Sequence, residues 1–229
     1  MCEQAYIPSP IADAQMEYIC QESDNVTTYK TDDYIIGYTL SGSCKICGKE
    51  GCREVAEHKL FVVEKGDYRI EQMIGRNGRF EQILLHLAAE KLFGYESRDD
   101  SRQEARFERA VLDGIVEGLT IEELADNCCL SLSTFKRHFR SRFSESPHRW
   151  FVRCRLDLAE RVLSVSGISV LNLAQMCGYS NTSHFIHAFR SRFGATPSHF
   201  VRQRYSRRYS SISSSTMSRS SHSVICNPE

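Results

Sequence analysis

Aromatic residues recur at every fourth position in two separate stretches of the chain. Phenylalanine occupies three such positions in residues 135–143 and three more in residues 185–193, and most residues between them are Lys, Arg, His or Ser. Positions i, i+4 and i+8 of an α-helix share one face. The pattern therefore predicts two amphipathic helices, each with a buried aromatic stripe and a basic outer face.

These two helices belong to a longer repeat. Residues 135–151 align with residues 185–201 without a gap. The identical pairs are Phe135/Phe185, Phe139/Phe189, Arg140/Arg190, Ser141/Ser191, Arg142/Arg192, Phe143/Phe193 and Pro147/Pro197. A shorter helical segment containing a Leu-Ala pair precedes each copy, at residues 121–131 and 170–180. Each unit is thus predicted to be a helix, a tight turn and a second helix, which together make a helix-turn-helix motif.

Residues that favour turns and helix starts stand at the expected places. Gly178 lies in the turn of the second unit, where a residue without Cβ adopts a positive φ at little cost. Ser131 and Ser180 are suited to cap the helices that follow. Thr120 and Glu123 form a Thr-x-x-Glu capping box at the start of the first unit. These signals support the same division into helices and turns.

The segment GYSNTSHFIHAFRSRFGATPSHF, residues 178–200, and its upstream copy resemble the carboxy-terminal DNA-binding domain of the AraC/XylS family of bacterial transcriptional regulators. The resemblance covers residues 103–204. It implies an all-α domain whose two helix-turn-helix units read promoter DNA, with RNA polymerase as a further partner and activation more than repression as the outcome. The chain departs from the family at Cys129, which stands in the first turn where the family often has glycine.

The buried stripes determine which residues of the two helices face outward. The resemblance assigns base reading to this outer face, and residues toward the helix ends are expected to hold phosphates. The base-reading candidates are Ser133, Lys136, Arg137, Asn181, Thr182, Ser183, Ile186 and His187. The phosphate-contact candidates are Thr134, Arg140, His184 and Arg190. Helix capping is the alternative role for Ser133, Thr182 and Ser183.

A long helix is predicted between the two units. Proline at position 147 suits the first turn of a helix, and apolar residues then follow at helical spacing as far as position 163. If this helix is rigid, it places the two basic helices in successive major grooves on one face of the duplex, about 34 Å apart.

The first hundred residues show a different pattern. Residues 28–43, 57–74 and 79–92 are rich in β-branched and aromatic residues and are separated by Gly, Asp and Asn, which predicts a small antiparallel sheet or partial barrel. Residues 83–92 are compatible with a final strand or with a helix. This half resembles the cupin-like sensory domain of many AraC-type regulators. That resemblance implies a small-molecule or protein effector, and the sheet edges suggest a homodimer.

The expected fold class is therefore α+β, with a β-rich regulatory domain at residues 1–97 and the DNA-binding domain at residues 103–205. Residues 95–103 are polar and lack large aliphatic side chains, so they are the predicted linker. Serine dominates residues 206–229 and apolar residues are sparse there. This composition predicts a disordered tail.

The formal net charge of zero hides an uneven distribution. Residues 1–100 contain 11 Lys and Arg against 18 Asp and Glu, whereas residues 101–229 contain 18 against 11. Residues 128–208 contain 14 basic and 3 acidic residues, as expected for a surface that meets a polyanion. The sequence shows neither a signal peptide nor an apolar run of membrane-spanning length. A cytoplasmic protein that does not contact a membrane is therefore expected.

The sequence contains no Gly-rich phosphate loop, Gly-x-Ser-x-Gly or His-Glu-x-x-His motif, so neither an enzyme nor a cofactor is expected. Cys44, Cys47 and Cys52 do have metal-like spacing, with His58 nearby. A hairpin would place Cys47 opposite Cys52 and leave Cys44 on the other face. Ordinary reduced thiols are the favoured interpretation, and a redox pair or zinc ligands are the alternatives.

A second function competes with transcription regulation. Methyl-accepting DNA repair and response proteins join a cysteine-zinc module to the same type of DNA-binding domain, and that module needs four cysteine ligands, one of them nucleophilic. The local cluster in this chain offers three cysteines, and Cys20 lies far upstream. The methyl-accepting protein is therefore the less favoured alternative.

Overall fold

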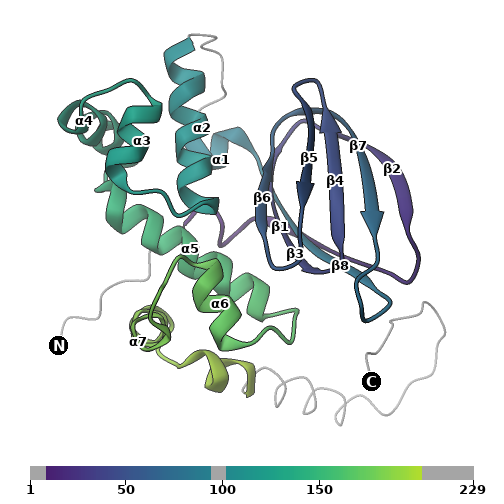
Figure 1. Ribbon diagram of the computed structural model, residues 1–229. Helices are drawn as coiled ribbons and strands as arrows, with labels where there is room; N and C mark the ends of the chain where they lie inside the picture. The colour runs from purple at the N-terminus through teal and green to yellow at the C-terminus, as the bar shows by residue number, and fades with distance from the viewer. Residues whose placement is uncertain (1–8, 94–101, 203–229) are drawn as a thin grey trace, which may run out of the picture.

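A computed structural model describes residues 9–93 and 102–202, and its β-rich half lies beside its helical half (Figure 1). The strands are β1 (Gln15–Gln21), β2 (Asn25–Thr31), β3 (Tyr34–Ser41), β4 (Ser43–Gly48), β5 (Gly51–Val55), β6 (Leu60–Val63), β7 (Gly66–Met73) and β8 (Phe80–Leu87). They form two four-stranded antiparallel sheets, in the orders β1-β8-β3-β6 and β2-β7-β4-β5. The predicted antiparallel pairing is confirmed, and the strands form two sheets.

Strands β3 and β8 are buried on both faces because their alternating side chains enter two different cores. Ile35 and Leu84 point to the space between the two sheets. Their neighbours Ile36 and Leu85 point the other way, into a core shared with the helices. The first sheet is thus the middle layer of the molecule, between the second sheet and the helical half.

Three features of the β-rich half differ from the sequence-based expectations. Strand β1 was not predicted; it lies at a sheet edge, and none of its residues is buried. The two alternatives for residues 83–92 both occur, since β8 is followed directly by α1 (Ala89–Phe93). The hairpin between β4 and β5 has a two-residue turn and not the four-residue loop at residues 48–51 that its glycines indicate, because Gly48 and Gly51 already pair with each other.

The helical half contains the predicted repeat, and the α+β fold class is confirmed. Its helices are α2 (Arg102–Val116), α3 (Ile121–Asn127), α4 (Leu132–Phe143), α5 (Pro147–Leu163), α6 (Val170–Met176) and α7 (Thr182–Phe193). Thr120 and Glu123 make the predicted capping box at the start of α3, and Pro147 begins the long helix α5. The predicted linker lies almost entirely outside the described residues, and the predicted serine-rich tail lies wholly outside them.

One hydrophobic core joins the two halves. Tyr34, Tyr38 and Val62 of the first sheet belong to the same buried cluster as Phe107 of α2 and Phe151 of α5. Ile11, which precedes β1, is 0% exposed and belongs to this cluster as well. The sheet therefore packs directly against the helices that support both helix-turn-helix units.

Helices α2 and α5 cross closely at Gly114, and this contact yields a prediction. A Cβ at position 114 would lie 2.6 Å from Cε1 of Phe151 and 3.1 Å from Cδ1 of Leu124. Overpacking of this kind costs about 1 to 3 kcal/mol, which exceeds the gain of about 1 kcal/mol in helix propensity. Gly114→Ala should therefore lower the free energy of unfolding measured by urea denaturation of the whole chain.

Gly167→Ala is the matched control, because a Cβ there meets nothing within 4 Å. It should change the free energy of unfolding by no more than about 0.5 kcal/mol. Equal stabilities of the two variants would show that the contact between α2 and α5 is looser than described.

Candidate nucleic-acid interface

Helix α4, the second helix of the first unit, has one buried and one exposed face. Phe135 and Phe139 are 0% exposed and lie in the shared core. The opposite side is exposed and carries four of the predicted DNA-contacting residues: Ser133, Lys136, Arg137 and Arg140. Thr134 is half-buried, and its hydroxyl accepts a hydrogen bond from the Ser131 hydroxyl at 2.8 Å. The predicted amphipathic character of this helix is confirmed.

Helix α7 repeats this arrangement in the second unit. Phe185 and Phe189 are 0% exposed. The exposed residues of the predicted set are Asn181, Ser183, His184, His187 and Arg190. Thr182 and Ile186 are less exposed: both are half-buried, and Ile186 packs against the core. The outer face of α7 is therefore less basic and more polar than that of α4.

The two units begin their second helices with different caps. Ser131 caps α4 as predicted, since its hydroxyl accepts from the Thr134 amide at 3.3 Å. The predicted cap Ser180 is wrong, because Asn181 caps α7 and its side-chain oxygen accepts from the amides of Ser183 at 2.8 Å and His184 at 3.4 Å. The turn of the second unit is one residue longer, which moves the cap to position 181. Capping is thus performed by residues 131 and 181 and leaves the side chain of Ser183 exposed.

Several arginines counted in the basic region point inward. On α4, Arg142 donates to Glu104 of α2 at 2.9 Å. At the equivalent position of α7, Arg192 donates through both Nε and Nη2 to the carboxylate of Asp157, the latter at 2.7 Å. Asp157 is 1% exposed, so this ion pair is buried in the protein. These side chains hold the helices in place, and the outward basic charge is smaller than the sequence count suggests.

The turns of the two units are built alike in spite of their different residues. Cys129 has φ 55° and the corresponding Gly178 has φ 77°, so both occupy the left-handed region. Before each turn a buried thiol donates to a backbone carbonyl, from Cys128 to Arg106 and from Cys177 to Arg155. Burial raises the pKa of Cys128 to about 11 and that of Cys177 to about 12. Both thiols therefore remain protonated at neutral pH and serve as packing residues.

Comparison with known proteins identifies the helical half. A family model described as a helix-turn-helix domain matches residues 124–203. The HTH-type transcriptional regulator AlkR of Acinetobacter baylyi is 37% identical over 84 residues, which are 37% of this chain and 28% of AlkR. The HTH-type transcriptional activator RhaS of Escherichia fergusonii is 29% identical over 155 residues, which are 62% of this chain and 54% of RhaS. Residues 124–203 are an AraC-type helix-turn-helix domain.

The chain thus covers about half or less of the length of these two relatives. Among solved structures, the DNA-binding domain of AdpA in complex with a target DNA is 28% identical to this chain, with a TM-score of 0.42. The aligned residues make up 45% of this chain and 96% of the AdpA domain. The assignment of residues 124–203 rests on the matched sequence, and the methyl-accepting alternative has no support among these matches.

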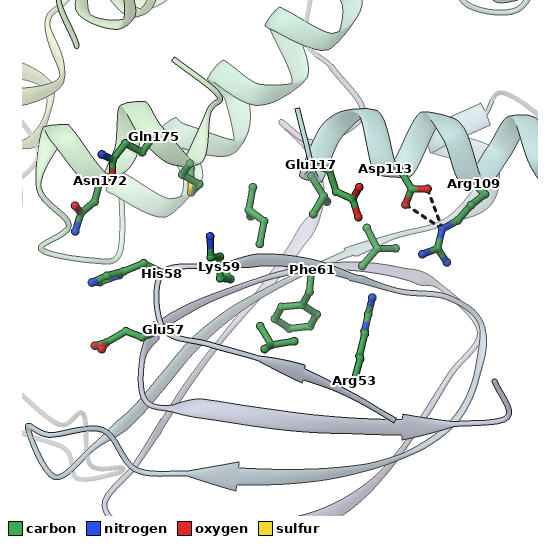
Figure 2. A pocket seen from close by; sticks show the side chains of 15 residues that line it. Arg53, Glu57, His58, Lys59, Phe61, Arg109, Asp113, Glu117, Asn172 and Gln175 are labelled. Carbon is green, nitrogen blue, oxygen red and sulfur yellow. Dashed lines mark hydrogen bonds and ion pairs between the residues drawn. The ribbon is translucent and has the colours of Figure 1, made fainter. Parts of the chain in front are cut away.

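A pocket lies where the AraC-type domain meets the β-rich half (Figure 2). Its volume is about 540 Å³, and its walls come from β5, β6, α2 and α6 together with the turn before β6. Phe61 lines it from β6, and the side chains of Arg53 and Glu117 extend into the space from the sheet side and from the helix side (Figure 2). The volume suits a small molecule. Sequence reasoning missed this site because its walls are brought together only by the fold.

The pocket contains several charged groups, and one of them, Arg109, is held by two carboxylates. Arg109 donates to Asp113 at 2.9 Å and to Glu64 at 2.6 Å. The guanidinium of Arg53 lies 6.0 Å from the centre of the Phe61 ring. Burial, and then the neighbouring charge of Arg109, lowers the pKa of Arg53. The guanidinium groups of Arg53 on β5 and Arg109 on α2 thus lie close enough at this pocket for their charges to interact.

The cysteine cluster of the β-rich half contains a disulfide. Cys47 lies opposite Cys52 as predicted, but the two form a disulfide, so the expectation of reduced thiols is wrong for this pair. Cys44 is 0% exposed, and burial raises the pKa of its thiol. Within residues 9–93 and 102–202, no group of three His, Cys, Asp or Glu is placed to hold a metal ion. None of the helices in those two ranges is long and apolar enough to cross a membrane.

The left-handed conformation of Cys129 leads to a second prediction. A residue with Cβ is strained in this region by about 1 kcal/mol relative to glycine. Cys129→Gly should therefore raise the free energy of unfolding of the chain by about that amount in urea denaturation.

Cys129→Ala is the control, because it keeps the Cβ and, like the glycine variant, removes the thiol that accepts from Arg106 at 3.4 Å. It should bring no such gain. If alanine stabilised the chain as much as glycine did, the strain would not lie in the backbone.

Proposed function

We propose that this chain is a transcriptional regulator that binds promoter DNA sequence-specifically, with α4 and α7 as its two recognition helices. The observation that carries the proposal is that both helices bury an aromatic stripe and expose a polar or basic face at the same place in a repeated helix-turn-helix unit. The names of AlkR and RhaS, which both describe HTH-type transcriptional regulators, support this function.

In this proposal the centre of each exposed face reads bases and its margins hold phosphates. On α4, Lys136 and Arg137 donate to base edges in the major groove, where Arg and Lys pair with guanine O6 and N7. Ser133 lies beside them. On α7 the reading residues are Asn181, Thr182, Ser183, Ile186 and His187. The phosphate contacts come from Thr134, Arg140, His184 and Arg190.

The proposed domain division follows the sequence, with a regulatory domain at residues 1–97 and the DNA-binding domain at residues 103–205. The pocket between them is the proposed effector site, because a small molecule there would touch both the sheet and the supporting helices.

Activation through RNA polymerase is the proposed outcome, supported by the names of RhaS and of VirF, the virulence regulon transcriptional activator of Yersinia enterocolitica. A homodimer completes the proposal. The protein is expected to act in the cytoplasm and without enzymatic activity.

Selection of duplexes from random-sequence DNA by the whole chain tests the proposed function. Recovery of a defined sequence with two half-sites about one helical turn apart is expected. Recovery of no preferred sequence, under conditions where the chain is folded, would refute it.

The exposed arginines of α4 provide a sharper prediction, because replacing Arg137 and replacing Arg140 should affect DNA binding in different ways. Arg137→Ala removes donors to a base edge. It should cost about 1 to 3 kcal/mol on the selected duplex, relax preference at one base pair and leave binding to random duplex nearly unchanged.

Arg140→Ala removes a phosphate contact and is the matched comparison. It should weaken binding to selected and random duplex alike. It should also lower the slope of log affinity against log salt concentration by about one unit, because one fewer counterion is released. Titrations of both variants on selected, single-base-changed and random duplexes at several salt concentrations give the answer. A change of base preference in Arg140→Ala would contradict this assignment of the helix face.

A further inference from the structure

The repeat of the helical half extends one helix further upstream than the sequence alignment indicated. The thiols of Cys128 and Cys177 donate to the carbonyls of Arg106 and Arg155, which place α2 and α5 equivalently in the two units. In this alignment α2 is the supporting helix of the first unit and α5 that of the second. Each unit therefore consists of a supporting helix followed by the helix-turn-helix.

A buried carboxylate occupies the same position on each supporting helix. Glu108 on α2 is 7% exposed and Asp157 on α5 is 1% exposed. The spacing that relates Arg106 to Arg155 also relates these two acids. Burial of a charged carboxylate is costly unless hydrogen bonds compensate for the lost water. The partners of these acids are therefore important to the placement of both helices.

The β-rich half donates one of these hydrogen bonds to each unit. The hydroxyl of Tyr34 donates to Glu108 at 3.0 Å, and the backbone amide of Ser9 donates to Asp157 at 3.0 Å. Burial, and then the adjacent charge of Glu108, raises the pKa of the Tyr34 phenol, so the phenol remains a donor. The two units are thus held through equivalent acids by two residues from the same part of the chain.

Both donors are attached to one sheet. Tyr34 begins β3, and Ser9 leads within a few residues to Ala14, the residue before β1. Strand β8 joins β1 to β3 through antiparallel pairing on both sides. The side chain of Arg161 on α5 also donates to the carbonyl of Ala14 at 2.7 Å. The sheet β1-β8-β3-β6 therefore connects α2 with α5 independently of their direct packing.

These attachments continue to the proposed recognition helices. Asp157, which accepts from Ser9, also accepts both donors of Arg192 on α7. In the first unit, Glu104 accepts from Arg142 of α4, and Glu104 lies one turn before Glu108 on α2. Each recognition helix is thus joined by charged hydrogen bonds to a supporting helix that the sheet contacts.

We propose that this sheet braces the two helix-turn-helix units and thereby determines the spacing between DNA half-sites that the chain accepts. The inference rests on the proposed function. Without the sheet, only α5 and its direct contact with α2 at Gly114 would set the separation of the recognition helices, and long helices bend. One added base pair moves a half-site by about 3.4 Å along the duplex and about 35° around it. A braced pair of units discriminates against this shift, whereas a hinged pair follows it.

The test uses the whole chain and the duplex recovered by selection, together with versions that have one base pair added or removed between the half-sites. Ser9→Pro deletes the amide donor to Asp157. Ser9→Ala is the matched control, since it keeps the amide and removes only the hydroxyl. The measured quantity is the ratio of affinities for the selected and the altered spacing.

Wild type and Ser9→Ala should show the same ratio, and Ser9→Pro should lower it about 3- to 10-fold, a fraction of what a hydrogen bond to a charged group contributes. Tyr34→Phe, which removes a single hydroxyl at the other attachment, should lower it as well. A structural defect alone would weaken binding to all spacings equally and leave the ratio unchanged.

Three results would overturn the inference. The first is an unchanged ratio in both Ser9→Pro and Tyr34→Phe, with or without a uniform loss of affinity. The second is a ratio lowered in Ser9→Ala as much as in Ser9→Pro, and the third is a wild-type chain that accepts altered spacings equally well. Each of them leaves sequence-specific binding in place. A wild-type chain that selects no duplex would instead refute the proposed function and this inference with it.

Discussion

The burial of one aromatic stripe on each of α4 and α7 is the constraint on which the rest of the helical half depends. Phe135, Phe139, Phe185 and Phe189 are all 0% exposed, and each stabilises the fold by about 1.5 to 3 kcal/mol through the area that it removes from water. Because the helical period fixes the direction of every side chain relative to the others, burial of one face also decides which side chains remain exposed. The exposed polar faces are therefore a consequence of core packing.

The same packing separates the basic side chains of the helical half into exposed ones and ones that pair with carboxylates inside the protein. Arg140 and Arg142 are two residues apart on α4, yet Arg140 is exposed and Arg142 is bound to Glu104. The buried pair of Arg192 and Asp157 repeats this on α7. An inward guanidinium next to a buried carboxylate orients a helix, whereas an outward one can attract phosphates. A count of basic residues in the sequence combines both kinds and overstates the surface potential.

Features that depend on neighbours in the chain were predictable from the sequence, and features that depend on distant pairing were not. The aromatic stripes, the capping box at Thr120 and the left-handed turn at Gly178 follow from local patterns. The cap at Asn181 was missed because one extra residue in the second turn shifts the helix start. The bonds from Tyr34 to Glu108 and from Ser9 to Asp157 join residues 74 and 148 positions apart, and no local pattern marks either partner.

The continuous core also has a consequence for regulation. The pocket is lined by α2 of the first unit, by α6 of the second and by the sheet that contacts both supporting helices. A ligand that fits better to one arrangement of these elements would change the affinity for DNA, and DNA would change the affinity for the ligand by the same factor. In a chain whose halves share one core, such coupling needs no flexible joint. It requires only that the sheet and both units move as parts of one packed body.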